Sequence, residues 1–183
     1  MTAKADLKRI VEGIDSQFGD EVTAFFDRET GDVLLITGED RNAAEQGDPL
    51  DDYPEWQHEM IETARMIISD ADGRYLALPS QRDFNEYEVM EQFCASLGNE
   101  EQAEELLYAM RGRGAFRRFK DKVQQLGIRE EWFRFRDGEL LEFAAEWVTD
   151  NGLTLAGKDK GRKPSWVISH LNAGGQLAEL EIK

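Results

Sequence analysis

Cysteine and long apolar runs are scarce in this 183-residue sequence. The single cysteine, Cys94, has no partner for an intramolecular disulfide, which excludes a secreted scaffold held by disulfides. No apolar run approaches the roughly 18 to 20 residues that a membrane-spanning helix needs. The first residues, MTAKADLKRIVEGI, lack the apolar core of a signal peptide. We therefore expect a cytoplasmic protein that makes no membrane contact and is stabilised by packing.

Residues that bind metals or act as nucleophiles lack the spacing that such chemistry requires. His58 and Glu62 are four positions apart, but His170 lies far along the chain and no HExxH pattern is present. The DADG stretch at 70–73 lacks the acidic residue that would complete a calcium loop, so it is interpreted as a turn. No nucleophile elbow, Walker loop or dinucleotide-binding loop follows a predicted strand. Cys94 lies on an apolar helical stripe and is interpreted as structural, so we expect neither a metal nor a cofactor.

Acidic residues outnumber basic ones by 38 to 22, which gives a formal net charge of −16. This average disfavours non-specific binding to nucleic acid or anionic membranes, because the field of the molecule repels phosphate groups. The excess of acidic residues is unevenly distributed along the chain. Residues 111–136 contain nine basic and three acidic residues, so this stretch carries +6 and the rest of the chain −22. A local interaction with anions is therefore still open.

Apolar residues recur three and four positions apart over much of the chain, which predicts amphipathic helices. Asp83, with Glu86 three residues later, is the predicted N-cap of one of them. Two of the helices are expected to be separated at Asp137 and Gly138. In residues 55–69 the predicted apolar stripe consists of Trp56, Met60, Ala64, Ile67 and Ile68. The helices are expected at 5–18, 55–69, 83–97, 100–111, 115–126, 128–135 and 139–148.

Short β-rich runs flanked by turn residues occur towards both ends of the sequence. The runs at 22–26 and 33–37 flank DRETGD and predict a β-hairpin, while 38–54 is acidic, contains Gly and Pro, and predicts a surface loop. The turn at 70–73 leads into a short strand that stops at Pro79. After a basic connector, runs at 165–171 and 176–182 flank NAGG and predict a second hairpin.

These elements predict one α+β domain over residues 1–183. The middle of the chain is helical, and the N-terminal and C-terminal hairpins are expected to form a small antiparallel sheet. Residues 5–152 form the expected folding unit, and 153–183 supply the connector and the C-terminal hairpin.

Several motifs resemble a bacterial uncharacterised protein family, number one hundred and fifty-eight of the UPF series. They are a Leu-Pro before Asp-Phe in LPSQRDF, the Met-Glu-x-Phe helix MEQF, the segment GAFRRFKD, and a Trp-x-x-x-Arg stretch followed by Glu-Trp. The hairpin containing DRETGDV resembles the start of that family. The resemblance covers residues 5–152, and GAFRRFKD is its most specific part. The family implies no activity, cofactor or catalytic residue.

The segment GRGAFRRFK is the best candidate site, because a Gly-rich helix start offers free backbone N–H groups to an anion. Arginine adds bidentate hydrogen bonds to phosphate. The alternative is structural: the cations neutralise acidic neighbours and their stems cover the core. Docking of a protein partner is a third possibility. The candidate ligand-binding residues are Arg111, Arg113, Gly114, Arg117, Arg118, Lys120 and Lys122.

The leading hypothesis is a non-enzymatic cytoplasmic binding or regulatory protein whose partner is a nucleic acid, a phosphorylated ligand or another acidic partner. A second is an enzyme that uses carboxylates such as Asp27, Asp83 or Glu91. A third is an acidic interaction protein or inhibitor that binds a basic protein through residues 38–62. Its acids include Asp48, Asp51, Asp52, Glu55 and Glu59. The oligomeric state is left open.

Overall fold

The computed structural model describes residues 3–17, 19 and 21–156. Its main sheet has three antiparallel strands, β2 (Val22–Asp27), β3 (Val33–Thr37) and β4 (Tyr75–Ala77), in the order β3-β2-β4. The predicted hairpin of β2 and β3 is confirmed. Two short strands, β1 (Lys4–Ala5) and β5 (Thr154–Leu155), form a separate parallel pair that was not predicted, because two residues carry no periodic pattern.

Seven helices and one 3₁₀ turn are present in the described part of the chain. The α+β class with a helical middle is confirmed. The bounds are α1 (Leu7–Asp15), α2 (Gly38–Gln46), η1 (Leu50–Asp52), α3 (Glu55–Ile68), α4 (Glu86–Ser96), α5 (Glu100–Ala109), α6 (Ala115–Gln125) and α7 (Arg129–Asp150).

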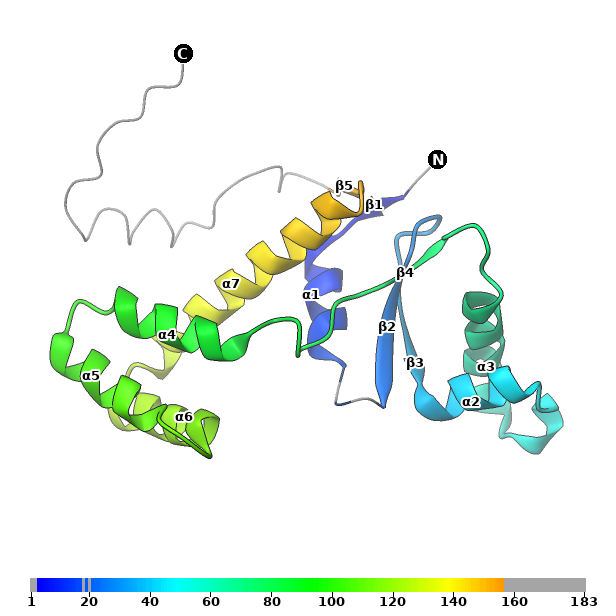
Figure 1. The fold of residues 1–183 in the computed structure, drawn as a ribbon. Helices are drawn as coiled ribbons and strands as arrows, with labels where there is room; N and C mark the ends of the chain where they lie inside the picture. The colour runs from blue at the N-terminus through cyan, green and yellow to red at the C-terminus, as the bar shows by residue number, and fades with distance from the viewer. Residues whose placement is uncertain (1–2, 18, 20, 157–183) are drawn as a thin grey trace, which may run out of the picture.

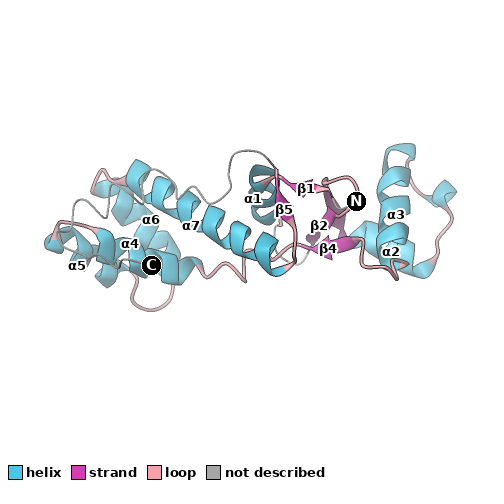
Figure 2. Cartoon of the chain, turned by 90° about the horizontal axis from the view of Figure 1, so that it is seen from above, coloured by secondary structure: helices cyan, strands magenta, loops and turns pink. Residues whose placement is uncertain are grey.

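The sheet lies in the middle of an elongated molecule (Figure 1). Helices α1 and α7 pack against each other, and α1 packs against one face of the sheet. Helices α4 and α6 pack against α7, and α5 packs against α4 and α6. Figure 2 shows α2 and α3 on the opposite side of the strands, away from the other helices. The pair α2–η1–α3, residues 38–68, is called the acidic hairpin below.

Aromatic packing dominates the main core, as helical spacing predicts. Trp132 is buried, with its ring centroid 4.8 Å from that of Phe119 and 5.3 Å from that of Phe93. Phe26 of β2 meets Trp147 of α7 edge-on at 6.3 Å, which joins the sheet to the helical part. The acidic hairpin has a smaller core of its own, outside the main cluster. It consists of the buried residues Ile36, Ala43, Ile61 and Ala64.

Gly13 allows α1 to approach the sheet closely. A Cβ atom at this position would lie 2.7 Å from Cγ1 of Val33 and 2.8 Å from Cδ1 of Leu78. Such distances are shorter than van der Waals contact, so a side chain here would force α1 away from β3. The glycine therefore fixes the spacing between the helix and the edge of the sheet.

The structure corrects three local predictions. Residues 38–46 are helical, because the Thr37 hydroxyl accepts the backbone N–H of Asp40 while the Asp40 carboxylate accepts from Thr37, a capping box within TGED. Helix α7 runs unbroken through Asp137 and Gly138; Gly138 is buried, and packing there outweighs its low helix propensity. The N-cap of α4 is Asn85 rather than Asp83.

The predicted C-terminal hairpin, 165–171 and 176–182, lies outside the described residues. In the described part, the third strand of the sheet is β4, which pairs with the side of β2 opposite β3.

Candidate interaction surfaces

The basic segment forms the turn between α5 and α6. Gly112 and Gly114 adopt left-handed φ angles of 74° and 81°, which glycine reaches without steric strain. Helix α6 starts at Ala115, and its N-cap residue Gly114 offers no side-chain cap. The backbone N–H groups of this helix start are thus available to a ligand.

Arg118 is folded back onto this turn. Its Nε donates to the carbonyl oxygen of Ala109 at 3.0 Å, and its Nη atoms donate to the carbonyl oxygens of Arg111 and Arg113. The guanidinium group thereby satisfies the last carbonyls of α5 and the turn, which have no helical partner. This use leaves Arg118 few donors for a phosphate group.

Other cations of the segment contact acidic or aromatic neighbours. Lys122 Nζ lies 2.9 Å from Glu105, and Lys120 Nζ lies 3.7 Å from Glu86. Arg111 stacks over the ring of Tyr108 at 5.5 Å. These contacts support the structural alternative for the segment.

Arg117, unlike Arg118 and Lys122, makes little contact with the rest of the chain. Its side chain is 91% exposed, and its Nε is 3.9 Å from Asp121, a weak surface pair. Arg111 and Arg113 are also exposed. Three arginine side chains of the segment are therefore exposed to solvent.

A groove of about 890 Å³ lies between α5 and α6, next to this segment. Of its three cations, Arg118 and Lys122 are already engaged as described, and Arg111 stacks over Tyr108. An anion entering the groove would meet several carboxylates, which oppose its binding. The acidic lining residues are Glu101, Glu104, Glu105 and Asp121.

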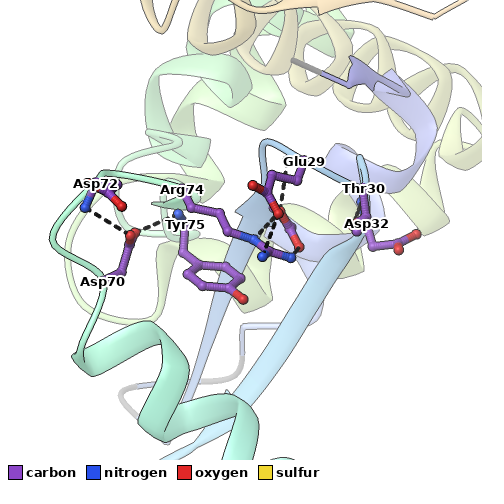
Figure 3. Close-up of polar contacts among 8 residues, drawn as sticks. Glu29, Thr30, Asp32, Asp70, Asp72, Arg74 and Tyr75 are labelled. Atoms are coloured by element: carbon purple, nitrogen blue, oxygen red, sulfur yellow. Dashed lines mark hydrogen bonds and ion pairs between the residues drawn. The ribbon is translucent and has the colours of Figure 1, made fainter. Parts of the chain in front are cut away.

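Asp27, a candidate catalytic carboxylate, is buried with a side chain only 5% exposed. It accepts from Arg74 Nε at 2.9 Å and Nη2 at 2.6 Å, and from the backbone N–H of Glu29 at 2.8 Å. Burial alone would raise the pKa of Asp27, but the hydrogen bonds and charge of Arg74 outweigh burial and lower the pKa. Figure 3 shows Arg74 reaching across to Glu29, so the group ties two turns together.

The other named carboxylates have different surroundings. Asp83 accepts from the backbone N–H and the hydroxyl of Ser80 at 2.7 and 2.8 Å, which lowers its pKa and fixes the turn before α4. Glu91 is exposed on α4. Asp70 accepts from the N–H groups of Asp72 and Tyr75 (Figure 3), which confirms that DADG forms a turn. Asp83 and Asp70 thus serve as local hydrogen-bond acceptors.

Cys94 and His58 have structural surroundings. Cys94 is buried, and burial raises the pKa of its thiol to about 11, so the reactive thiolate is scarce at neutral pH. His58 Nε2 lies 2.8 Å from the carbonyl oxygen of Tyr53, on the turn before α3. Among residues 3–156, apart from 18 and 20, no group of three or more His, Cys, Asp or Glu residues is placed to hold a metal ion.

The acidic hairpin carries nine acidic residues between positions 38 and 62 and one basic residue, Arg41. Two of the acids have structural roles: Asp40 accepts from Gln57 at 3.0 Å, and Asp48 accepts from the Tyr53 hydroxyl at 2.8 Å. Within the described residues, the other seven acids are exposed and form no ion pair. They are Glu39, Glu45, Asp51, Asp52, Glu55, Glu59 and Glu62.

The titration of Tyr53 reflects the negative potential of this surface. The hydrogen bond to Asp48 raises the pKa of the phenol, and the negative charges of Asp48, Glu39 and Asp52 raise it further. A cation placed at this surface would be stabilised by the same carboxylates.

Helix α3 turns its aromatic residue outward, contrary to the predicted stripe. The buried positions are Gln57, Ile61 and Ala64, whereas Trp56 is 75% exposed and Met60 is partly exposed one turn later. Both stripes have helical spacing, so periodicity alone could not choose between them. We call the exposed set Asp51, Asp52, Glu55, Trp56, Glu59 and Met60 the hairpin face.

No helix in the described ranges has the length and apolarity needed to cross a membrane.

The model of the uncharacterised protein family UPF0158 matches residues 4–171. The match continues past residue 152, where the resemblance read from the motifs ended, and takes in 153–171. Searches of curated proteins and of solved structures returned no match. Because the family model covers most of the chain, the chain belongs to the uncharacterised protein family UPF0158.

Proposed function

We propose that this chain is a non-enzymatic binding protein that docks a basic protein segment on the hairpin face. The observation that carries the proposal is Trp56, a 75% exposed aromatic side chain set among unpaired carboxylates. Exposed apolar residues surrounded by polar ones are typical of protein interaction sites, where tryptophan often contributes a large share of the binding energy.

The chemistry of the face fits lysine- or arginine-rich segments. The carboxylates attract cationic side chains over several ångströms, and the indole ring binds a cation over its face. Met60 adds a flexible apolar contact beside the ring. By contrast, Arg118 and Lys122 of the basic turn before α6 are already bound to groups of their own chain.

The test measures binding of a short fluorescein-labelled peptide of alternating lysine and leucine by fluorescence anisotropy. The double variant Asp52→Lys/Glu59→Lys reverses two charges of the face. The control variant Glu91→Lys/Glu146→Lys makes the same change in net charge at exposed positions on α4 and α7. We expect the first variant to weaken binding about tenfold or more and the control much less, since two short-range charge contacts are lost only in the first.

Equal weakening in the two variants would show that net charge alone attracts the peptide, and the proposal would be wrong. Trp56→Ser tests the aromatic contribution separately. We expect it to weaken binding about 3- to 10-fold without altering net charge, because a cation–π contact is lost.

Binding of a phosphate-bearing ligand at the turn before α6 is the second candidate. It is favoured by the exposed guanidinium groups of Arg111, Arg113 and Arg117 near the uncapped helix start. The test titrates a single-stranded RNA across a salt series into the native chain and into Arg113→Glu/Arg117→Glu. Salt-dependent binding that the variant loses would support this candidate, and no binding to the native chain would exclude it for RNA.

We also infer a cytoplasmic location. It is supported by the single, buried thiol of Cys94, which suits a reducing compartment.

A further inference from the structure

The basic turn before α6 combines exposed cations with exposed aromatic side chains. Arg111, Arg113 and Arg117 are exposed. Tyr108 is 72% exposed beneath the guanidinium group of Arg111, and Phe116, the neighbour of Arg117, is 45% exposed. Aromatic residues and arginine are the residue types enriched in protein interfaces. The turn therefore has the composition of an interaction surface.

The three exposed arginines retain hydrogen-bond donors for an external acceptor. Within the described residues Arg113 forms no ion pair, and Arg117 lies 3.9 Å from Asp121. Arg111 contacts the ring of Tyr108 rather than a carboxylate. A guanidinium group presents five N–H donors, so each of these side chains can still bind a carboxylate from outside the chain.

Other arginines of the chain are held much more closely. Arg9 lies 2.7 Å from Asp32. Arg74 lies 2.6 Å from the buried carboxylate of Asp27. Such short pairs leave little for a partner to gain, whereas the loosely held arginines of the basic turn gain contacts when a carboxylate approaches.

The hairpin face has the complementary composition. Its four carboxylates are exposed and form no ion pair within the described residues. Beside them, Trp56 is largely exposed and Met60 partly so. Arginine binds carboxylates through paired hydrogen bonds and stacks on the indole ring of tryptophan. Each surface thus offers apolar contacts together with the charge that is opposite to the other's.

The two surfaces lie at opposite ends of the elongated molecule. Helices α2 and α3 lie at one end and α5 and α6 at the other, with the sheet, α1 and α7 between them (Figures 1 and 2). The hairpin face and the basic turn of one chain therefore do not meet in this structure. A contact between them requires a second molecule.

We infer that the hairpin face docks the basic turn before α6 of a second copy of this chain. The inference rests on the proposed function, because it names the basic segment that the face binds. The local charges are complementary: residues 38–62 contain nine acidic residues and one basic residue, and residues 108–118 contain four arginines and no acid.

The net charge of −16 opposes association of two copies at long range. Salt screens this repulsion, since the Debye length is about 10 Å at 0.1 M ionic strength. Charges in direct contact are screened less, so the complementary pairs at the contact decide whether two copies associate. The contact is expected to be weak and to depend on salt.

Sedimentation equilibrium of the full chain tests this inference. The chain concentration is raised to about 1 mM, a range in which weak contacts are populated. We expect the average mass of the native chain to rise above that of the monomer as the concentration increases. Arg113→Glu/Arg117→Glu and Asp52→Lys/Glu59→Lys should each weaken association about tenfold or more, because each reverses two charges of the contact.

An equimolar mixture of these two variants supplies the sharpest measurement. The reversed turn of one variant matches the reversed hairpin face of the other, and their unchanged surfaces match as well, so the mixture should regain the association that each variant loses. The matched controls Lys8→Glu/Arg134→Glu and Glu91→Lys/Glu146→Lys make the same changes in net charge at other exposed positions. They should associate as the native chain does.

A native chain that stays monomeric at every concentration would overturn the inference. A mixture that associates no better than its two components would also overturn it, because the two surfaces would then not meet. The peptide assay tests the proposed function separately. A monomeric native chain that binds the lysine–leucine peptide would overturn only the self-association, whereas equal peptide binding by the hairpin variant and its control would overturn the proposed function itself.

Discussion

The basic turn before α6 and the acidic hairpin both contain many charged residues. In the basic turn several cations contact groups of their own chain, whereas most acids of the hairpin are exposed to solvent. Arg118 and Lys122 fold back onto carbonyl groups and a carboxylate of their own chain. The carboxylates of the hairpin face point to solvent without partners. Long arginine and lysine stems can reach back over several residues, whereas short acidic side chains on the outer side of a helix cannot. A conspicuous charge run in a sequence is therefore not by itself an exposed surface.

The largest expected effect concerns how the acidic hairpin is attached. Ile61 is fully buried in its small core, so we expect Ile61→Ala to lower the free energy of unfolding by about 2 to 5 kcal/mol. The neighbouring Met60 faces outward, and Met60→Ala should change the free energy of unfolding by about 0.5 kcal/mol or less. Urea denaturation measures both. Similar losses in the two variants would mean that α3 does not present Met60 to solvent, and the hairpin face would lose its basis.

The contrast between buried and exposed carboxylates predicts a pH dependence. The folded pKa of Asp27 is lowered, so its contribution to stability is present above the unfolded value of about 3.9 and is lost as the pH falls through the folded pKa. We expect Asp27→Asn to cost about 1 to 3 kcal/mol at pH 6. Urea midpoints for the native chain and the variant should converge as the pH is lowered below about 4.

The exposed acid Asp52 supplies the control for this prediction. It has no partner that it would lose, so Asp52→Asn should leave the urea midpoint nearly unchanged at every pH. A difference between native chain and Asp27→Asn that stays constant from pH 6 to below pH 4 would contradict the role assigned to the Asp27–Arg74 pair.

The smallest expected effect separates two adjacent arginines of the basic turn. Arg118→Ala removes several hydrogen bonds to carbonyl groups and should destabilise the chain by about 1 to 2 kcal/mol. Arg117→Ala removes a weak surface pair and should cost less than about 0.5 kcal/mol. Thermal unfolding of both variants gives the comparison. A larger loss of stability for Arg117→Ala than for Arg118→Ala would contradict the role assigned to Arg118 in stabilising this turn.

Much of the fold follows from local patterns in the sequence. The β2–β3 hairpin, the DADG turn and six of the seven helical regions were predictable, because apolar spacing, turn residues and glycine ends are local signals. Helix α2 was missed although TGED contains its capping box, since the acidic, Gly- and Pro-containing composition of 38–54 outweighed that signal. The predicted break at Gly138 failed because burial on α7 overrides the low propensity of glycine.

The candidate surfaces were less predictable than the elements that carry them. The candidate residues Arg111 to Lys122 do lie together at one helix start, as their spacing requires. Lys120 and Lys122 are engaged by Glu86 and Glu105, which belong to other helices. Trp56 was placed on the predicted apolar stripe because Trp56, Met60 and Ala64 fit helical spacing as well as Gln57, Ile61 and Ala64 do.

The sequence by itself determined the α+β class, the family, the order of the main elements and the uneven charge, because each of these depends on composition or on neighbours a few residues apart. The tertiary structure alone decided which face of α3 is exposed and which cations are consumed within the chain. Those outcomes depend on contacts between residues distant in sequence, such as Gln57 of α3 with Asp40 and Lys122 of α6 with Glu105. Local patterns in the sequence do not predict such contacts.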